Sequence, residues 1–382
     1  MAPLSTRTVT ATLQRVPPPW PSWVNVENTL RCNLDCIWCA QALVGSTKSG
    51  VDMPLPLFER IAAEVLPRVS RLSFSVAGEP TIAPQFLEFL DLVNQLDLTT
   101  ELVTNATALH RPGLLPRLLP RLGLLIASID GARPATVEHI RAGAKFARIV
   151  ENLERFDAAR RAIPARPEFL VAMTLSAVNV DELPEVVDLA AKLGADRVVC
   201  SWLQVMDPSL LDLSLHAAPA RIERTFGLAR ARSRHRRIGL ELPDEPPLIP
   251  VGLGARRAFE VFAPRRRRAA LRAALQRAGV LAWETRSGLG ARCSFLWRRA
   301  YLHADGQVSP CCVQGRPYVG SLLDRSFAEI WIGPEMTALR AGMFDGHPHS
   351  ACTRCSQGQG PNPAPIEAWT SPVRNPLDAR SG

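Results

Sequence analysis

Residues 32–39 read CNLDCIWC, which places Cys32, Cys36 and Cys39 at offsets of four and three. Nine cysteines occur among 382 residues. For any one cysteine, the chance that two others stand at these two offsets is therefore roughly one in 1,800. Thiolates are soft ligands, and three within one short loop indicate a metal or iron–sulfur site. A structural zinc site needs a fourth ligand, and no further His or Cys lies near this loop. We therefore favour an iron–sulfur cluster.

A 4Fe–4S cluster held by three cysteines leaves one iron without a protein ligand, just as a catalytic zinc keeps one position open. The pattern C-x3-C-x2-C, with the aromatic Trp38 before the last cysteine, resembles the radical S-adenosylmethionine (radical SAM) superfamily. The resemblance implies that the open iron binds the amino and carboxylate groups of S-adenosyl-L-methionine. It also implies that electron transfer into the sulfonium releases a 5′-deoxyadenosyl radical, so the cofactor carries the difficult chemistry.

Composition excludes several classes of protein. Apolar residues make up 47% of the chain, which argues against global disorder, and 382 residues are enough for two or three domains. No apolar run reaches the roughly 18 residues of a membrane-spanning helix, and residues 1–20 lack the apolar core of a secretory signal. Cysteines grouped at metal-site spacings without such a signal favour a reducing, cytoplasmic location.

The net charge is +9, and many of the arginines are grouped. One group is Arg265 to Arg268, and the other is Arg230, Arg232, Arg234, Arg236 and Arg237. Basic chains can bind phosphates or nucleic acid, but no aromatic residues are interleaved to support single-strand binding. We interpret both groups as solvated helical faces, with a phosphate or nucleic-acid contact as the alternative, and do not favour a nucleic-acid partner.

Strand-like and helix-like segments alternate along residues 23–203. Strands are expected at 23–27, 71–76, 99–103, 123–129, 168–175 and 196–203, and helices at 56–66, 84–96, 146–162 and 181–193. The segment 123–129 is almost wholly apolar, so burial on both faces is predicted. The alternation predicts right-handed βαβ units on a parallel sheet. The fold class is therefore α/β, and the family resemblance implies a partial (βα)6 TIM-like barrel.

Two short motifs follow the second and third expected strands, at the strand ends where barrel enzymes place their active sites. Residues 77–80, AGEP, resemble the family's G-G-E-P, and residues 104–106, TNA, resemble its T-N-G. The resemblance implies that Gly78 and Glu79 hold the methionine amino group and that Asn105 belongs to the cofactor site. An ordinary Gly-Pro turn is the alternative for the first motif. In each motif an alanine stands where the family has a glycine, and alanine allows a smaller range of backbone conformations than glycine.

A third motif follows the fourth expected strand. Residues 128–131, SIDG, resemble the family's S-I-D-G, and the resemblance implies that Ser128 and Asp130 reach the ribose and the methionine carboxylate. Arg141 matches an arginine often seen downstream of that motif. Arginine can pair with a carboxylate through two hydrogen bonds, so Arg141 is a candidate ligand of the cofactor, with a surface role as the alternative.

Cys200 ends the sixth expected strand. A buried cysteine usually acts as a small hydrophobic residue, so core packing is the first interpretation. The alternative is a catalytic hydrogen-atom donor that quenches a substrate radical, as radical SAM epimerases require.

The second group of cysteines lies near the C-terminus. Cys293 and Cys311 flank an expected hairpin, with strands at 300–303 and 307–310 and a type I′ turn at Asp305-Gly306. The pair Cys352 and Cys355 follows, after a capping box, Ser326-x-x-Glu329, that opens a short helix. Four thiolates would close a second 4Fe–4S site completely. A zinc ribbon, with His347 and His349 as further candidate ligands, is the alternative.

This segment resembles the SPASM/Twitch extension of radical SAM enzymes, including the paired Cys311-Cys312 and the residues EIW at 329–331. Full SPASM domains carry further cysteines after the C-x2-C pair, whereas none follows Cys355 here. The resemblance therefore implies one auxiliary cluster, with Cys312 as a spare. We expect an N-terminal extended arm at 1–22, the radical SAM barrel at 23–240, a Pro-rich linker and basic helical insertion at 241–292, the auxiliary domain at 293–358 and a flexible tail at 359–382.

A closed cluster has no free iron, so we interpret it as an acceptor of the electron left when a substrate radical becomes a carbonyl. This reasoning favours an oxidoreductase for a small polar molecule, such as a sugar, aminocyclitol or nucleotide-linked compound. The alternative is a maturase that oxidises, crosslinks or epimerises a ribosomal peptide. Only 31 residues precede Cys32, too few for the leader-binding module of many peptide maturases, although a separate protein could supply it. Flavodoxin or ferredoxin is the expected electron donor.

Overall fold

The computed structural model describes residues 20–43, 45, 50–74, 77–205, 207–215, 218–243, 293, 295–312, 316–345 and 348–352. Most of the expected arm and insertion, the whole expected tail, His347 and Cys355 lie outside these residues. The chain divides into two compact units. Unit 1 comprises Met1–Leu30, Val51–Glu101 and Arg286–Gly382, and unit 2 comprises Arg31–Gly50 and Leu102–Thr285. Both contain residues of the expected barrel domain, whose boundaries stay predictions.

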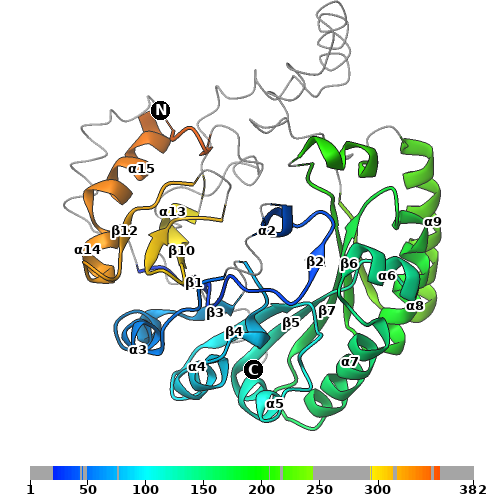
Figure 1. Ribbon diagram of the computed structural model, residues 1–382, viewed down its shortest axis with the longest axis horizontal. Coiled ribbons are helices and arrows are strands. Elements are labelled where there is room, and N and C mark those ends of the chain that lie inside the picture. The colour runs from blue at the N-terminus through cyan, green and yellow to red at the C-terminus, as the bar shows by residue number, and fades with distance from the viewer. Residues whose placement is uncertain are drawn as a thin grey trace, which may run out of the picture. The chain divides into compact units, whose positions relative to one another are not determined.

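Unit 1 contains strands in the order β12-β11-β10-β1-β3. They are β1 (Trp23–Val26), β3 (Arg71–Phe74), β10 (Arg299–Leu302), β11 (Gln307–Ser309) and β12 (Gly320–Ser321). β1 is parallel to β3 on one side and to β10 on the other, while β11 is antiparallel to both of its neighbours (Figure 1). The pattern of residues predicted the β10–β11 hairpin. It did not predict the pairing of β10 with β1, because the two strands lie far apart in the sequence.

Aromatic residues form much of the core of unit 1. The ring of Phe58 stacks on that of Phe89 with centroids 4.0 Å apart, and Phe74 meets Phe86 edge-on at 5.1 Å. The predicted capping box is present, because Ser326 accepts the backbone N–H of Glu329 and Glu329 accepts that of Ser326. The helices of this unit are α3 (Leu55–Glu64), α4 (Phe86–Val93), α13 (Phe295–Arg298), α14 (Phe327–Trp331) and α15 (Pro334–Asp345), with 3-10 turns η1 (Leu66–Arg68) and η2 (Pro80–Ile82).

Unit 2 contains four parallel strands in the order β5-β7-β8-β9. They are β5 (Leu122–Ser128), β7 (Glu168–Leu175), β8 (Arg197–Trp202) and β9 (Gly239–Glu241), and a separate two-stranded ribbon joins β2 (Asp35–Cys36) to β6 (Arg141–Ala142). β4 (Thr99–Thr104) has residues in both units. The helices are α2 (Ala40–Leu43), α5 (Leu114–Leu118), α6 (Pro134–Ile140), α7 (Phe146–Arg161), α8 (Leu183–Lys192) and α9 (Pro219–Arg236), with 3-10 turns η3 (Leu119–Arg121), η4 (Val180–Glu182) and η5 (Pro208–Leu213).

The strands of unit 2 have two unlike faces. Phe169 of β7 meets Phe156 of α7 at 5.5 Å, and Trp202 of β8 stacks on Phe226 of α9 at 5.6 Å, so one face packs on helices (Figure 1). Burial along β5 alternates, and Leu124 and Ile126 on the other face are only half-buried. The prediction that β5 is buried on both faces is therefore wrong. An apolar run alone does not reveal which face is left partly open.

The turn between β10 and β11 also differs from its prediction. A type I′ turn needs positive φ at both Asp305 and Gly306. Only Gly306 has it, with φ 86°, and the N–H of His303 donates to the carbonyl of Gln307 at 2.9 Å. These contacts enclose a three-residue loop with one left-handed glycine, which is another common hairpin connection.

The arginines of α9 support the interpretation as a solvated face. Arg232 and Arg236 each lie 2.6 Å from a carboxylate oxygen of Asp188, and these side chains are about half-exposed. The other arginine group, residues 265–268, lies outside the described residues. Among the helices of the described ranges, none is long and apolar enough to cross a membrane.

Candidate cofactor and iron–sulfur sites

The three-cysteine loop is held to unit 2 by backbone pairing. Cys36 of β2 lies opposite Arg141 of β6, and the N–H of Ile37 donates to the carbonyl of Ile140 at 3.0 Å. Gly143 lets the two segments approach, because a Cβ at this position would stand 3.3 Å from the carbonyl oxygen of Asn33. Gly143 also has a φ of 95°, which side-chain-bearing residues rarely adopt. The loop therefore has a defined backbone between its first and last cysteine.

Side-chain amides hold the first cysteine of the loop. The Nδ2 of Asn105 donates to Asn33 Oδ1 at 3.0 Å and lies 3.8 Å from Cys32 Sγ. Asn33 donates in turn to Thr107 Oγ1 at 2.8 Å, and that hydroxyl donates to Asn105 Oδ1 at 2.6 Å. Donors near a ligating sulfur tune the metal that it binds. The sequence analysis proposed Asn105 and missed Asn33 and Thr107, although Asn33 stands beside Cys32 in the loop itself.

A buried ion pair stands behind the second cysteine. Arg141 Nη2 lies 2.7 Å from Asp130 Oδ2, and both side chains are nine-tenths buried or more. Burial raises the pKa of the Cys36 thiol to about 11, while Arg141 acts in the opposite direction. Burial also opposes the charge of Arg141, but Asp130 and Cys36 outweigh it and raise the pKa of Arg141. Cysteine binds metal as the thiolate, so the Arg141 cation favours the ligand form.

The remaining groups of Asp130 and Arg141 bear on cofactor binding. Asp130 Oδ1 accepts the backbone N–H of Thr174 at 2.8 Å, and its carbonyl accepts the amide of Asn179 at 2.9 Å. The Nε of Arg141 is buried and has no hydrogen-bond partner among the described residues. A carboxylate in this position would satisfy it, as the sequence prediction for Arg141 requires. Ser128 ends β5 on its partly exposed face, and its predicted cofactor contact stays a prediction.

Cys200 lies on the face of β8 that packs on helices. Its register partner is Met173, and it shares its face with Trp202, which stacks on α9. Ser128 pairs with Ala172, on the opposite face. Burial, with a smaller contribution from Asp130, raises the pKa of the Cys200 thiol to about 12. This placement supports core packing over hydrogen-atom donation.

The opposite face presents polar groups that the sequence analysis missed. Thr174 and Ser201 are register partners near the carboxyl ends of β7 and β8, on the same face as Ser128, and Ser201 is exposed. Period-two alternation from Cys200 would have placed Ser201 on the other face of the strand.

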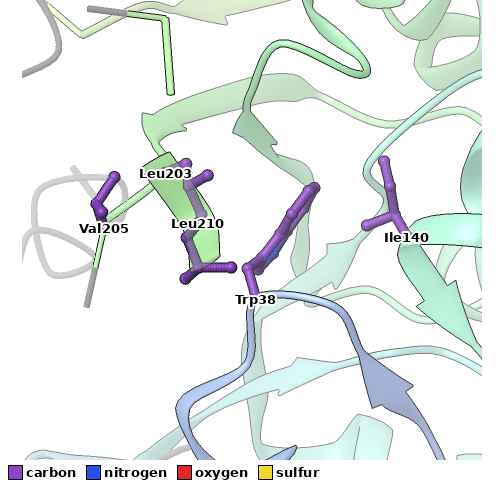
Figure 2. Close-up of a cluster of buried hydrophobic side chains, with 5 residues drawn as sticks. All are labelled: Trp38, Ile140, Leu203, Val205 and Leu210. Atoms are coloured by element: carbon purple, nitrogen blue, oxygen red, sulfur yellow. The ribbon is translucent and has the colours of Figure 1, made fainter. Parts of the chain in front are cut away.

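Trp38 connects the cysteine loop with the segment after β8. Its ring packs among Ile140, Leu203, Val205 and Leu210, and Figure 2 shows it between Ile140 on one side and the leucines on the other. Trp38 is 9% exposed, so a large apolar area is removed from water next to the third cysteine. The packing restrains Cys39, whose carbonyl accepts the N–H of Leu43 as α2 begins.

The other two predicted motifs contain one left-handed residue each. Gly78 has φ 68°, and Glu79 caps η2 by accepting the N–H and the hydroxyl of Thr81 at 3.2 and 2.6 Å. Ala106 has φ 61° and is fully buried, whereas Ala77 is not left-handed. The two alanines that replace family glycines are therefore unlike, because only Ala106 occupies a conformation that glycine adopts without strain.

The C-terminal cysteines come from separate segments of unit 1. Cys293 and Cys352 both pack against a cluster formed by Leu296, Trp297 and Met343. Cys311 follows β11, and its carbonyl accepts the hydroxyl of Ser309 at 3.0 Å. Cys312 is exposed, and Cys355 lies outside the described residues. The sequence assigned these four cysteine ligands, and the assignment stays a prediction.

Near this cluster lies a buried cation. Arg340 of α15 is fully buried, donates to the carbonyls of Leu296 and Trp331 at 3.0 and 2.7 Å, and lies over the Trp331 ring. Burial lowers the pKa of Arg340 to about 9. No described acid forms an ion pair with it within 4.0 Å.

The three cysteines of the loop fit a 4Fe–4S cluster. Among the described residues, no three His, Cys, Asp or Glu side chains are grouped to hold one ion. A 4Fe–4S cluster binds each thiolate to a different iron, so its ligands need not converge on one point. The electrostatic interaction of Cys36 with both Cys32 and Cys39 shows that the three thiols are near one another.

These features are those of an α/β protein whose three-cysteine loop would hold an iron–sulfur cluster with one iron open to a small cofactor. The chain matches the Radical SAM superfamily over residues 26–190 and the SPASM iron-sulfur cluster-binding domain over residues 293–356. The chain therefore contains a radical SAM domain and a C-terminal SPASM domain. Its cofactors are S-adenosyl-L-methionine with a 4Fe–4S cluster, and auxiliary iron–sulfur in the SPASM domain.

Curated relatives match part of the chain. The PqqA peptide cyclase of Methylobacterium sp. (strain 4-46) is 26% identical over 197 residues, 49% of this chain and 48% of the relative. The mycofactocin maturase MftC of Mycobacterium ulcerans is 27% identical over 178 residues, 44% of each chain. The tungsten-containing aldehyde ferredoxin oxidoreductase cofactor-modifying protein of Pyrococcus furiosus is 28% identical over 193 residues, 49% of this chain and 52% of the relative. The chain spans about half the length of the curated relatives it matches.

Two solved structures share the fold. Streptococcus suis SuiB bound to S-adenosylmethionine has a TM-score of 0.59 and 15% identity, covering 87% of this chain and 71% of that one. Native anSMEcpe with bound AdoMet has a TM-score of 0.55 and 16% identity, covering 82% of this chain and 81% of that one. They support the predicted α/β fold with parallel strands.

Proposed function

We propose that this radical SAM enzyme modifies a peptide, by oxidation, crosslinking or epimerisation. The proposal depends on one observation: two curated relatives of the chain, which are 26–27% identical to it, are named as a peptide cyclase and a maturase. The small-molecule substrate favoured by the sequence is the second candidate. The argument for a small-molecule substrate depends partly on the shortness of the segment before Cys32. That segment gives no information about a leader-binding protein encoded separately.

The residues of unit 2 would divide the work as follows. Cys32, Cys36 and Cys39 would hold the cluster, which when bound supplies the electron that cleaves S-adenosylmethionine to a 5′-deoxyadenosyl radical. Arg141 would orient the methionine carboxylate with its unpartnered Nε, while Asp130 keeps the guanidinium in place. Arg141 and Asp130 are both buried, so water is excluded from the ion pair between them and their attraction is stronger than in water.

The argument for an auxiliary electron acceptor applies to a peptide as well. Forming a crosslink or a carbonyl removes two hydrogen atoms, and the step after hydrogen-atom abstraction releases one proton and one electron. The SPASM cluster would take that electron, and an external flavodoxin or ferredoxin would reduce the first cluster. Epimerisation instead returns a hydrogen atom to the substrate and needs a donor, and the buried position of Cys200 favours the oxidative reactions.

Anaerobic turnover assays test the proposal. Reconstituted, reduced full-length protein would be incubated with S-adenosylmethionine and either candidate precursor peptides or aminocyclitols and sugars. We expect 5′-deoxyadenosine formation to rise with a peptide, together with a peptide that has lost two hydrogen atoms in its mass spectrum. Turnover with a sugar or aminocyclitol alone would favour the second candidate. Failure to form 5′-deoxyadenosine under any condition would contradict both.

A further inference from the structure

A chain of buried polar side chains in unit 1 leads to the loop that carries Cys311. Glu27 follows β1, His303 follows β10 and Ser309 ends β11. His303 Nδ1 lies 3.3 Å from Glu27 Oε1, and its Nε2 lies 2.9 Å from Ser309 Oγ. The Ser309 hydroxyl then donates to the carbonyl of Cys311 at 3.0 Å. The pairing of β1 with β10 is what brings Glu27 beside His303.

All three side chains of this hydrogen-bonded series are removed from water. Glu27, His303 and Ser309 are 5%, 3% and 0% exposed, and the ring of Tyr318 packs edge-on against His303 with centroids 5.4 Å apart. Buried polar groups are costly unless they are hydrogen-bonded, and leaving one partner unsatisfied costs about 1–3 kcal/mol. The three side chains therefore depend on one another, and none can turn away without leaving a neighbour unpaired.

The direction of the hydrogen bonds is fixed at one end. Ser309 donates its hydroxyl hydrogen to the carbonyl of Cys311, which can only accept, and its Oγ also lies 2.9 Å from His303 Nε2. On the other side of the ring, His303 Nδ1 faces the carboxyl of Glu27.

We propose that Glu27, His303 and Ser309 are positioning residues for the auxiliary cluster, which fix the Cys311 ligand and set the reduction potential of that cluster. A hydroxyl that donates to the ligand's own peptide stabilises negative charge on that side of the cluster, and hydrogen bonding around the ligands is one of the factors that set cluster potentials. The low local dielectric strengthens the effect. The proposal rests on Cys311 as a cluster ligand and not on the identity of the substrate.

Potentiometric titration of both clusters, followed by electron paramagnetic resonance, tests this in reconstituted full-length protein without substrate. The variants are Ser309→Ala, His303→Gln, Ser309→Thr, which keeps the hydroxyl, and Ser326→Ala as a control that weakens the same unit elsewhere. We expect the auxiliary potential to be lower in Ser309→Ala and His303→Gln and near wild type in Ser309→Thr and Ser326→Ala. The three-cysteine cluster is the internal reference, and its potential should not move.

The possible outcomes separate clearly. Wild-type auxiliary potentials in Ser309→Ala and His303→Gln, with iron content retained, would overturn the proposal. If Ser309→Ala loses auxiliary iron while Ser309→Thr and Ser326→Ala keep it, the hydroxyl positions Cys311 and the proposal stands. If Ser309→Ala and Ser309→Thr lose iron alike, side-chain volume decides and the proposal fails. None of these results depends on turnover of a peptide, so they are independent of the proposed substrate.

Discussion

The two groups of cysteines are built in opposite ways. Cys32, Cys36 and Cys39 lie in one short loop, which strand pairing, amide hydrogen bonds and the packing of Trp38 hold in place. Cys293, Cys311 and Cys352, in contrast, are separated by long stretches of chain, and Cys293 and Cys352 pack against a shared apolar cluster. The first group needs a local fold, whereas the second needs a folded domain. Substitutions should therefore affect the two regions differently.

The largest expected difference is in cleavage of S-adenosylmethionine. Cys36→Ala should abolish formation of 5′-deoxyadenosine, because it removes a ligand of the cluster with the open iron. Cys311→Ala should keep that activity without substrate and lose only auxiliary iron. Chromatography of 5′-deoxyadenosine and iron analysis measure both effects, with Cys312→Ala, in the exposed neighbouring cysteine, as the control. Cleavage at the wild-type rate by Cys36→Ala would contradict the assignment of the first cluster.

The next largest effect should come from the ion pair behind Cys36. Asp130→Ala leaves Arg141 buried and unpaired, and breaking a buried pair in this way costs about 3–5 kcal/mol of unfolding free energy. Urea denaturation of the protein measures it. The matched control is Arg133→Ala, which breaks the exposed pair with Glu185 and should change stability very little. Equal losses in the two variants would show that burial of the Asp130–Arg141 pair has no energetic importance.

The contrast between the two regions also explains what the sequence could reveal. The loop 32–39 could be predicted because its three cysteines and Trp38 are close together in the sequence. The capping box at Ser326 could be predicted for the same reason. The pairing of β1 with β10 and the Glu27–His303 contact join residues far apart in the chain, and the Asp130–Arg141 pair joins the end of one motif to the separate strand β6. No local pattern encodes such contacts. Cys200 shows a related limit, because its face depends on the register of β7 with β8.

In the C-terminal region, the capping box should make a moderate contribution. Ser326→Ala removes the side chain that accepts the N–H of Glu329, and losing such a cap costs about 1 kcal/mol. Thermal denaturation of unit 1, followed by the fluorescence of Trp331 one turn away, reports the change. Thr337→Ala is the control, because its hydroxyl makes only a long 3.4 Å contact with the carbonyl of Ile332. A larger loss in Thr337→Ala would reverse the assignment.

The smallest expected effect is a gain in stability at Ala106. Its left-handed conformation costs an alanine roughly 1–2 kcal/mol, while glycine adds unfolded-chain entropy worth about 0.4–1 kcal/mol. Ala106→Gly should therefore stabilise the protein by on the order of 0.5 kcal/mol. Ala77→Gly, at the other alanine in a family glycine position, should destabilise it, because Ala77 is not left-handed. Denaturant midpoints of the two variants should move in opposite directions.

The parallel pairing of β10 with β1 has a consequence for how the chain could be divided. Trp23, Val24, Asn25 and Val26 all have register partners in β10, so the SPASM segment covers the side of β1 away from β3. A protein cut before residue 293 would present that row of backbone donors and acceptors to solvent, and bare strand edges recruit other strands. Such a fragment should self-associate through β1. In the full chain the C-terminal segment covers this edge of β1, so we expect it to prevent such self-association.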